Sequence, residues 1–240
     1  MTPPATGRVR RVVTDRRGGA SAGEFDSFNL GDHVGDDPAA VAANRRRLAG
    51  HLGLPPGNVV WMDQVHGTRI ARVHGPTGGA VPATDGLVTD RPGLALAVLT
   101  ADCVPVLAAD EEAGVIGAAH AGRVGAAAGI VPALIGAMGS LGALPDRITV
   151  LLGPAADGRH YELPEDLAAE VEAALPGSRT STVAGTAGVD IRAGLTRQLA
   201  GLGVSRVSAD PRCTIADDTL FSYRRQGRTG RQASVIWRQQ

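Results

Sequence analysis

The stretch LALAVLTADCVPVLAADEEAGVIGAAHAG, residues 94–122, decides the fold because three short apolar runs follow one another within it. The runs cover residues 94–99, 104–108 and 115–119, and polar residues or glycine lie between them. Apolar runs of this length are typical of β-strands. Similar runs elsewhere in the chain predict further strands at residues 9–14, 59–62, 69–73, 87–89, 148–152 and 234–237.

Other segments predict helices, the clearest of them over residues 38–52. Asp37 and Pro38 form an N-cap followed by proline at the first helical position, and Gly53 predicts the end of this helix. Further helices are expected over residues 123–138, 164–174 and 189–202. Pro132 lies inside the first of these and mildly disfavours it. Because strands and helices mix without regular βαβ alternation, the predicted fold class is α+β with a mixed sheet.

Composition excludes several classes of protein. A chain of 240 residues with 43% hydrophobic side chains can bury a sizeable core, and this length suits one domain or two small ones. Zero net charge and 3% aromatic residues argue against a protein that binds nucleic acid or a membrane surface. All 24 cationic residues are arginine, which excludes a Schiff-base lysine and a P-loop lysine.

No targeting or disulfide signal stands out in the sequence. Two cysteines, Cys103 and Cys213, form no disulfide framework, and the first 17 residues contain no apolar signal-peptide core. The longest uncharged run, residues 124–145, is mostly alanine and glycine, so it does not predict a membrane span. We therefore expect a cytoplasmic protein.

Three segments place a metal-ligating side chain near the end of a predicted strand. His66, Cys103 and His120 offer two imidazoles and one thiolate, a reasonable ligand set for zinc with a fourth position left open. Open three-ligand zinc is typical of catalytic sites, because the metal lowers the pKa of its bound water. The three residues are far apart in the chain and form no compact motif. On spacing alone, structural histidines and an inert core cysteine are the more common interpretation.

Two further segments are suited to anions. Arg123 lies in a glycine-containing turn that leads into a predicted helix, and Arg224 follows Ser222 in the segment FSYRR, residues 221–225. An ordinary turn and a charged surface hairpin are the alternatives. Asp85 and Asp102 are the carboxylates that could act as a general base or orient a ligand histidine. In a regular strand Asp102 would point away from the face of Cys103, which favours a structural role.

The following segments occur in this order along nearly the whole chain: FNLG (28–31), HVGDDP (33–38), NR (44–45), QVHG (64–67), DGLVT (85–89), TADCVP (100–105), HAG (120–122), GP (153–154), YE (161–162), CT (213–214) and FSYRR (221–225). Together they resemble the laccase-domain family of bacterial and vertebrate purine nucleoside phosphorylases. Members of that family are also called multicopper polyphenol oxidases and peptidoglycan editing factors. Each motif alone is weakly specific, whereas the ordered set is highly specific.

The resemblance implies one domain over residues 1–240, with layered mixed sheets flanked by helices. It implies zinc bound by the catalytic residues His66, Cys103 and His120. It also implies phosphorolysis of adenosine, inosine and methylthioadenosine, and deamination of adenosine, with purine nucleoside and phosphate as the binding partners. The expected substrate or phosphate contacts are Arg224, Ser222, Arg123 and Asn29.

The chain departs from the family pattern in three places. The residue before Phe221, often aromatic in the family, is Leu220 here, which should be tolerated. The family usually has Trp-Arg where this chain has Arg123 and Val124, so the guanidinium is displaced by one residue. The family often has Cys where this chain has His160, which would add a ligand or a proton donor if it lay near the site.

Three other functions remain as alternatives to zinc chemistry. A copper-dependent phenol oxidoreductase could use the same ligands with Met62 as an axial ligand, although six histidines are too few for a multicopper site. A metal-free hydrolase would use Cys103 as a nucleophile activated by His120 or His66. A non-catalytic protein of cell-wall quality control would keep only the fold.

Overall fold

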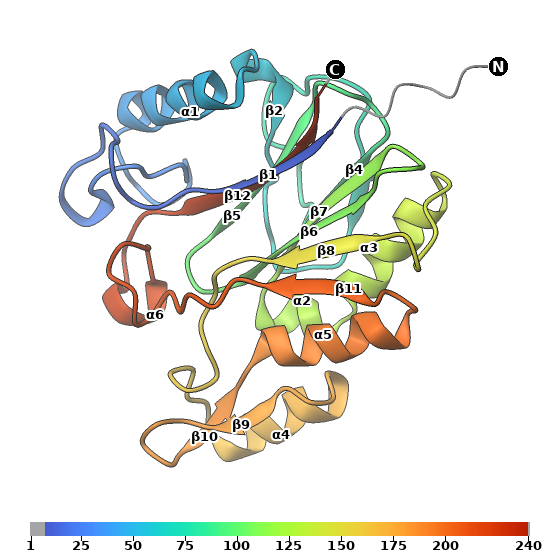
Figure 1. Cartoon of the computed structure of the whole chain (residues 1–240). Helices are drawn as coiled ribbons and strands as arrows, with labels where there is room; N and C mark the ends of the chain where they lie inside the picture. Colours follow the sequence, from blue (N-terminus) through green and yellow to red (C-terminus); the bar gives the residue numbers. More distant parts are fainter. Residues whose placement is uncertain (1–7, 240) are drawn as a thin grey trace.

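Two mixed β-sheets lie face to face between helices in the computed structural model of the protein (Figure 1). The structure describes residues 8–239, so residues 1–7 and 240 of the predicted domain lie outside the described part. The first sheet has the strand order β1 (Val9–Val13), β12 (Gln232–Arg238), β5 (Ala95–Thr100), β2 (Val59–Val60). The second has the order β11 (Arg206–Ala209), β8 (Thr149–Leu152), β6 (Val104–Asp110), β7 (Val115–Ala121), β4 (Gly86–Thr89), β3 (Ile70–Arg72).

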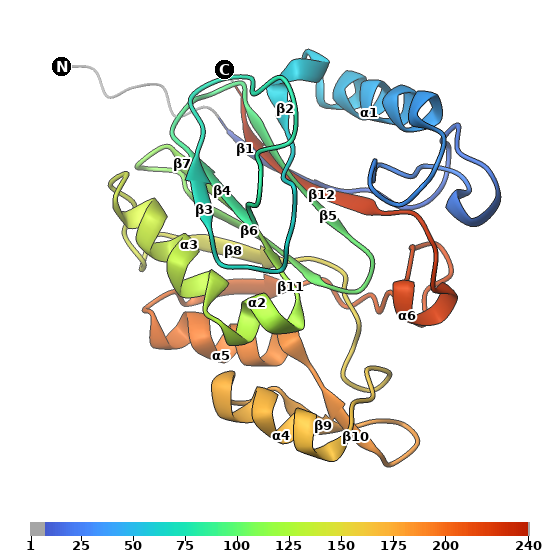
Figure 2. The same cartoon turned by 180° about the vertical axis from the view of Figure 1, so that it is seen from behind.

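Helices cover the outer faces of the two sheets (Figures 1 and 2). Helix α1 (Pro38–Leu52) packs on the first sheet, and α3 (Ile130–Gly139) and α5 (Ile191–Gly201) pack below the second. The remaining elements are α2 (Arg123–Ala127), α4 (Glu165–Ala174), α6 (Tyr223–Gln226), the small sheet of β9 (Arg179–Ser181) and β10 (Ala187–Val189), and 3-10 turns at Gly23–Phe25 and Pro56–Asn58. None of the helices within residues 8–239 has the length and apolar character needed to cross a bilayer.

Strand β5 shows why residues 95–99 are apolar without alternation. Its residues Ala95, Ala97 and Leu99 pack in the cluster beneath α1, whereas Leu96 and Val98 pack in the cluster between the two sheets. Side chains alternate between the faces of a strand, so both faces of β5 are buried. The strand pairs β2–β5, β3–β4 and β8–β11 are parallel and the others are antiparallel, so the predicted α+β class with mixed sheets is confirmed.

The connection between β5 and β6 takes the chain from the first sheet to the second. Residues 101–103 make this crossing in an irregular conformation, and Asp102 has a φ of 101°, in the left-handed region. The crossing therefore places Cys103 where the two sheets are joined, immediately before β6.

The predicted caps of α1 are confirmed. The Asp37 side chain accepts the backbone N–H of Ala39 at 2.9 Å, and Gly53 ends the helix with a φ of 69°. The prediction of a single helix over residues 123–138 was wrong. The chain forms two helices there, α2 and α3, separated at Gly129, which has a φ of 95°. Pro132 lies in the first turn of α3, where its missing N–H costs no helical hydrogen bond. Strands β9, β10 and β11 and helix α6 were not predicted.

Candidate metal centre

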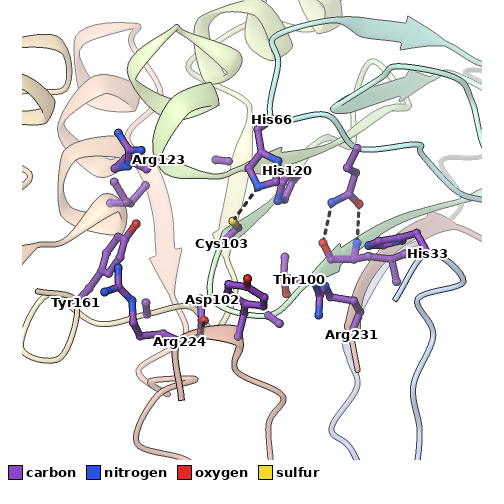
Figure 3. A pocket seen from close by; sticks show the side chains of 17 residues that line it. His33, His66, Thr100, Asp102, Cys103, His120, Arg123, Tyr161, Arg224 and Arg231 are labelled. Atoms are coloured by element: carbon purple, nitrogen blue, oxygen red, sulfur yellow. Dashed lines mark hydrogen bonds between the residues drawn. The ribbon is translucent and has the colours of Figure 1, made fainter. Parts of the chain in front are cut away.

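Three chain segments bring two imidazoles and one thiol together at one end of the sheets (Figure 3). His66 lies in the loop between β2 and β3, Cys103 precedes β6, and His120 lies near the end of β7. Their potential ligand atoms all lie within 4.8 Å of one another, and Cys103 Sγ is 3.8 Å from His66 Nε2. The two imidazole rings meet edge to face with centroids 4.7 Å apart.

Gly122 leaves open the space that an ion needs. A Cβ atom at this position would lie 2.6 Å from Cδ2 of His66 and 3.0 Å from Sγ of Cys103. Any other residue would therefore intrude between two of the three donors. Imidazole nitrogen and thiolate sulfur are the donors that bind zinc at about 2.0–2.3 Å, so small shifts of these side chains suffice for coordination. The residues present fit a three-ligand metal site.

Asp85 connects two of the three donor segments. Its fully buried carboxylate accepts the Nδ1–H of His120 at 2.9 Å and the backbone N–H groups of His66 at 3.0 Å and Gly67 at 2.8 Å. The first bond fixes the tautomer of His120, so that its Nε2 is free to bind a metal. The others hold His66 in a left-handed conformation with a φ of 61°. Asp85 therefore orients His120, a candidate metal ligand.

The charges of the group favour a thiolate even without a metal. Burial raises the pKa of the Cys103 thiol, but His120 and His66 outweigh burial and lower it to about 6. Burial lowers the pKa of His120, but the Cys103 thiolate and Asp85 outweigh burial and raise it to about 9. Both shifts favour the charged pair, a thiolate beside an imidazolium. The thiolate is the form of cysteine that binds metals and acts as a nucleophile.

A cavity of about 630 Å³ opens beside the three donors. Figure 3 shows Arg123, Tyr161 and Arg224 on one side of Cys103, with His33, Thr100 and Arg231 on the other. The complete lining consists of His33, Gln64, His66, Leu99, Thr100, Ala101, Asp102, Cys103, His120, Ala121, Arg123, Ala156, Tyr161, Ile191, Tyr223, Arg224 and Arg231. Within residues 8–239, the three arginines of this lining form no ion pair with a carboxylate.

Arg224 and Arg123, two of the four expected substrate contacts, line this cavity. The guanidinium carbon of Arg224 lies 4.9 Å from the centroid of the Tyr161 ring. The backbone N–H of Arg224 donates to Asp102 at 2.6 Å, and the hydroxyl of Thr214 donates to the same carboxylate at 2.6 Å. Asp102 therefore fixes the start of α6, in agreement with the structural role favoured from the sequence. It does so from an irregular turn and not from the regular strand that the sequence argument assumed.

The other two expected contacts, Ser222 and Asn29, are not among the residues that line the cavity. Ser222 is fully buried, and its hydroxyl accepts the backbone N–H of Arg225 at 3.2 Å, which caps α6. Asn29 is also fully buried, and its side-chain oxygen accepts the backbone N–H groups of Gly31 at 2.9 Å and Arg231 at 2.8 Å. Both side chains support the walls of the cavity.

The departures from the family pattern have separate outcomes. Val124 is 51% exposed, whereas Arg123 lines the cavity, so a guanidinium is still present at this wall. His160 does not line the main cavity, because its Nδ1 lies 3.6 Å from Sγ of Cys213 and it faces a smaller neighbouring cavity. Met62, the axial ligand considered for copper, is buried in the cluster between the sheets.

Sequence reasoning missed Arg231, Thr100 and Gln64 as cavity residues. Gln64 is fixed by a pair of hydrogen bonds of 2.8 Å to the backbone of Leu99, which ties the loop of His66 to β5. Gln64, Thr100, His33 and Tyr161 all lay within the recognised motifs, and that was the signal available for them. Arg231 had only its position shortly after FSYRR.

Comparison with known proteins identifies the family. The family model for multi-copper polyphenol oxidoreductase laccase matches residues 10–239. The chain belongs to this family. Its predicted membership, with the family fold, is thereby confirmed.

Curated relatives within this family carry a more specific name. The chain is 62% identical to "Purine nucleoside phosphorylase Rv2149c" of Mycobacterium tuberculosis over 230 residues, which cover 96% of this chain and 92% of the relative. It is 58% identical to "Purine nucleoside phosphorylase Cgl2154/cg2365" of Corynebacterium glutamicum, with 98% and 96% covered.

Solved structures share the fold. Protein NMB0706 of Neisseria meningitidis is 37% identical with a TM-score of 0.88, and the match covers 99% of this chain and 96% of that one. YlmD of Geobacillus stearothermophilus is 35% identical with a TM-score of 0.88, and the match covers 100% of this chain and 94% of that one.

Proposed function

We propose that this protein is a zinc-dependent purine nucleoside phosphorylase. The observation that carries the proposal is the convergence of His66, Cys103 and His120 beside a cavity lined by arginines without carboxylate partners. The donor set suits zinc, and the arginines suit a phosphate. The names of the curated relatives support a purine nucleoside as the second substrate.

Phosphate binds against Arg224 and Arg123 in this proposal. A guanidinium presents its N–H groups in a fork that matches two oxygens of a phosphate, and neither arginine has a carboxylate that competes for it within residues 8–239. Tyr161 supports the guanidinium of Arg224, and Asp102 holds its backbone. An oxygen of the bound phosphate attacks C1′ of the ribose, and the bond from C1′ to the purine breaks. The electron pair leaves with the base, which gains the proton that the attacking hydrogen phosphate gives up, and the products are ribose 1-phosphate and the free purine.

Zinc would be held by His66, Cys103 and His120, where it supplies a Lewis acid for the reaction. Asp85 keeps His120 in the tautomer that presents Nε2. Adenosine, inosine and methylthioadenosine are the proposed nucleosides. The proposed second activity is deamination of adenosine, in which water replaces the 6-amino group and inosine and ammonia are formed.

Zinc is favoured over copper by the histidine content of the site. Only His33, His66 and His120 of the six histidines line the cavity, whereas a multicopper oxidase binds several copper ions through a larger set. Because the site needs a reduced thiolate, a reducing compartment such as the cytoplasm suits it.

One observation favours a second candidate function. In space, the Asp85 carboxylate bonds the imidazole of His120, and this imidazole lies beside the thiolate of Cys103. Metal-free Cys–His hydrolases use the same arrangement of carboxylate, imidazole and thiolate. Such an enzyme would work without a metal, keep its activity in a chelator and lose it with iodoacetamide.

Metal analysis combined with a product assay tests the proposal. We expect about one zinc per chain in the purified protein, and conversion of inosine to hypoxanthine and ribose 1-phosphate that depends on phosphate and is lost after chelation. Adenosine without phosphate is expected to yield inosine. A metal-free protein that remains active would favour the thiol enzyme. A zinc-loaded protein that yields none of these products from adenosine or inosine would favour a non-catalytic role.

Replacing Arg224 with alanine is expected to raise the KM for phosphate by about 10- to 100-fold, because a charge-assisted contact to the anion is lost. The zinc content should be unchanged, since no ligand is affected. Arg225→Ala is the neighbouring comparison. The Arg225 guanidinium donates to the carbonyl oxygens of Thr214, Ile215, Asp217 and Leu220. Its loss should therefore lower Tm but change the KM for phosphate little. Equal phosphate dependence in the wild type and Arg224→Ala would refute the assignment.

A further inference from the structure

Three segments of the chain meet at Asp102. Its backbone carbonyl accepts the N–H of Ala156 at 2.9 Å. Its Oδ1 accepts the hydroxyl of Thr214 at 2.6 Å, and its Oδ2 accepts the backbone N–H of Arg224 at 2.6 Å. Ala156 follows β8, Thr214 follows β11, and Arg224 lies in α6. Asp102 therefore ties the crossing between the two sheets to the side of the cavity that carries Arg224.

The backbone conformation of Asp102 places two side chains in one cavity. Its φ of 101° lies in the left-handed region, which residues other than glycine rarely adopt. In a regular strand Asp102 and Cys103 would point to opposite faces, whereas here both line the cavity. Figure 3 shows Asp102 between Cys103 and Arg224. The three hydrogen bonds of Asp102 hold the turn that makes this arrangement.

Asp102 is poorly suited to bind either zinc or phosphate itself. Within residues 8–239, the side chains that could hold a metal are His66, Cys103 and His120, and Asp102 is not one of them. Each of its carboxylate oxygens already accepts a hydrogen bond from the protein. A carboxylate also has the same sign of charge as phosphate and repels it. Its effect on the site is therefore exerted through its neighbours.

We propose that Asp102 is a positioning residue that holds the thiolate of Cys103 and the start of α6 in one fixed relation. The proposal rests on the proposed function, in which Cys103 binds zinc and Arg224 binds phosphate. Cys103 follows Asp102 directly, so a rotation of the backbone at Asp102 moves Sγ. Loss of the bond to the Arg224 N–H frees the start of α6. Asp102 thereby keeps zinc and phosphate at the separation that the reaction needs.

The proposal predicts a combined effect that no substitution within one half of the site should give. Arg224→Ala is expected to weaken phosphate binding alone, and His66→Ala is expected to weaken zinc binding alone. Loss of the two carboxylate bonds of Asp102 should weaken both, although Asp102 binds neither zinc nor phosphate.

Two substitutions of Asp102 isolate these bonds. The asparagine in Asp102→Asn tolerates a left-handed φ, its Oδ1 can accept the N–H of Arg224, and its NH₂ group can donate to the hydroxyl oxygen of Thr214. The glycine in Asp102→Gly adopts the same φ without strain but makes neither bond. The difference between the two variants therefore reports the bonds and not the backbone strain.

Asp102→Gly is expected to weaken zinc binding and phosphate binding by about tenfold or more each and to change the visible spectrum of the cobalt-substituted protein. Asp102→Asn should stay within about threefold of the wild type in both affinities and keep its cobalt spectrum. Zinc affinity is measured by competition with a chromophoric chelator. Phosphate affinity is measured by titration of inorganic phosphate into the zinc-loaded protein, and Tm is recorded to verify folding.

Thr214→Val removes one of the two bonds and tests the same link if Asp102→Gly does not fold. It should weaken both affinities by about 3- to 10-fold. Thr219→Val is the matched control, because the Thr219 hydroxyl also donates to an aspartate, Asp217, at 2.7 Å. Neither residue of that pair lines the cavity. Thr219→Val should therefore lower Tm without changing the affinity for zinc or phosphate.

Three outcomes would overturn the proposal. Equal losses in Asp102→Asn and Asp102→Gly would show that the charge of the carboxylate is needed, as for a general base or a metal ligand. A change in only one of the two affinities would restrict Asp102 to one half of the site. Equal effects of Thr214→Val and Thr219→Val would indicate a loss of general stability.

These binding measurements separate the proposal from the proposed function, because none of them needs turnover. The expected pattern of affinities supports the role of Asp102 even if the wild type does not cleave inosine. An active enzyme whose Asp102→Gly and Thr214→Val variants keep the wild-type affinities contradicts that role and leaves the proposed function intact.

Discussion

Replacing His66 with alanine is expected to lower kcat/KM for nucleoside phosphorolysis by about 1,000-fold, because the loss of one of three ligands removes the Lewis acid. The substitution leaves Asp85, His120 and Cys103 together, so a metal-free thiol enzyme in which His120 activates Cys103 would lose much less activity. His66→Ala therefore distinguishes the two chemistries more sharply than a change at Cys103, which removes a ligand and a nucleophile at once. The measurements are zinc per chain and steady-state kinetics with inosine and phosphate.

His74→Ala provides the control for this prediction. His74 is exposed and does not line the cavity, so its loss should affect neither zinc content nor activity. A His66→Ala protein that is zinc-free but retains most of its activity would contradict the zinc mechanism.

Replacing Asp85 with asparagine is expected to weaken metal binding by about 10- to 100-fold and to lower activity at a fixed, subsaturating zinc concentration. An asparagine amide can accept through only one of its two polar atoms, so its NH₂ group would face the backbone N–H groups of the His66 loop. His120 would also lose the charge that fixes its tautomer. The measurement is zinc affinity by competition with a chromophoric chelator, together with the visible spectrum of the cobalt-substituted protein, which reports ligand geometry.

Asp110→Asn is the matched control for Asp85→Asn. Asp110 is also a fully buried carboxylate, but it accepts backbone N–H groups of Ala113 and Leu144 and pairs with Arg147 at 3.0 Å, away from the cavity. Its substitution should lower Tm without changing zinc affinity or the cobalt spectrum. If both variants changed zinc affinity equally, the effect would be one of general stability and not of ligand orientation.

Local signals predicted part of the fold well. Both ends of α1 depend on neighbouring residues, since Asp37 caps the start and Gly53 adopts the conformation that ends the helix. The division of the segment after His120 into α2 and α3 could not be foreseen in the same way. It depends on Gly129 adopting a positive φ. Glycine adopts either sign of φ, so its presence in a helical pattern does not predict that conformation.

The site was predictable in its residue types but not in its geometry. His66, Cys103 and His120 meet only because the chain crosses between sheets at residues 101–103 and because the register of β4 and β7 sets Asp85 beside His120. In a single sequence, the spacing of residues does not reveal such long-range contacts. The motifs of Ser222 and Asn29 likewise marked the right region, but a motif does not tell whether a side chain faces the cavity or supports its wall.

The unequal burial of the three donors has a consequence for how an ion would enter and leave. His120 is buried on a central strand and Cys103 is half-buried at the joint of the sheets, whereas His66 is exposed on a loop. An ion arriving from solvent would meet the His66 loop first, and the strand-borne pair would complete its coordination. Exchange of the ion would thus begin at the His66 side chain, without unfolding of either sheet.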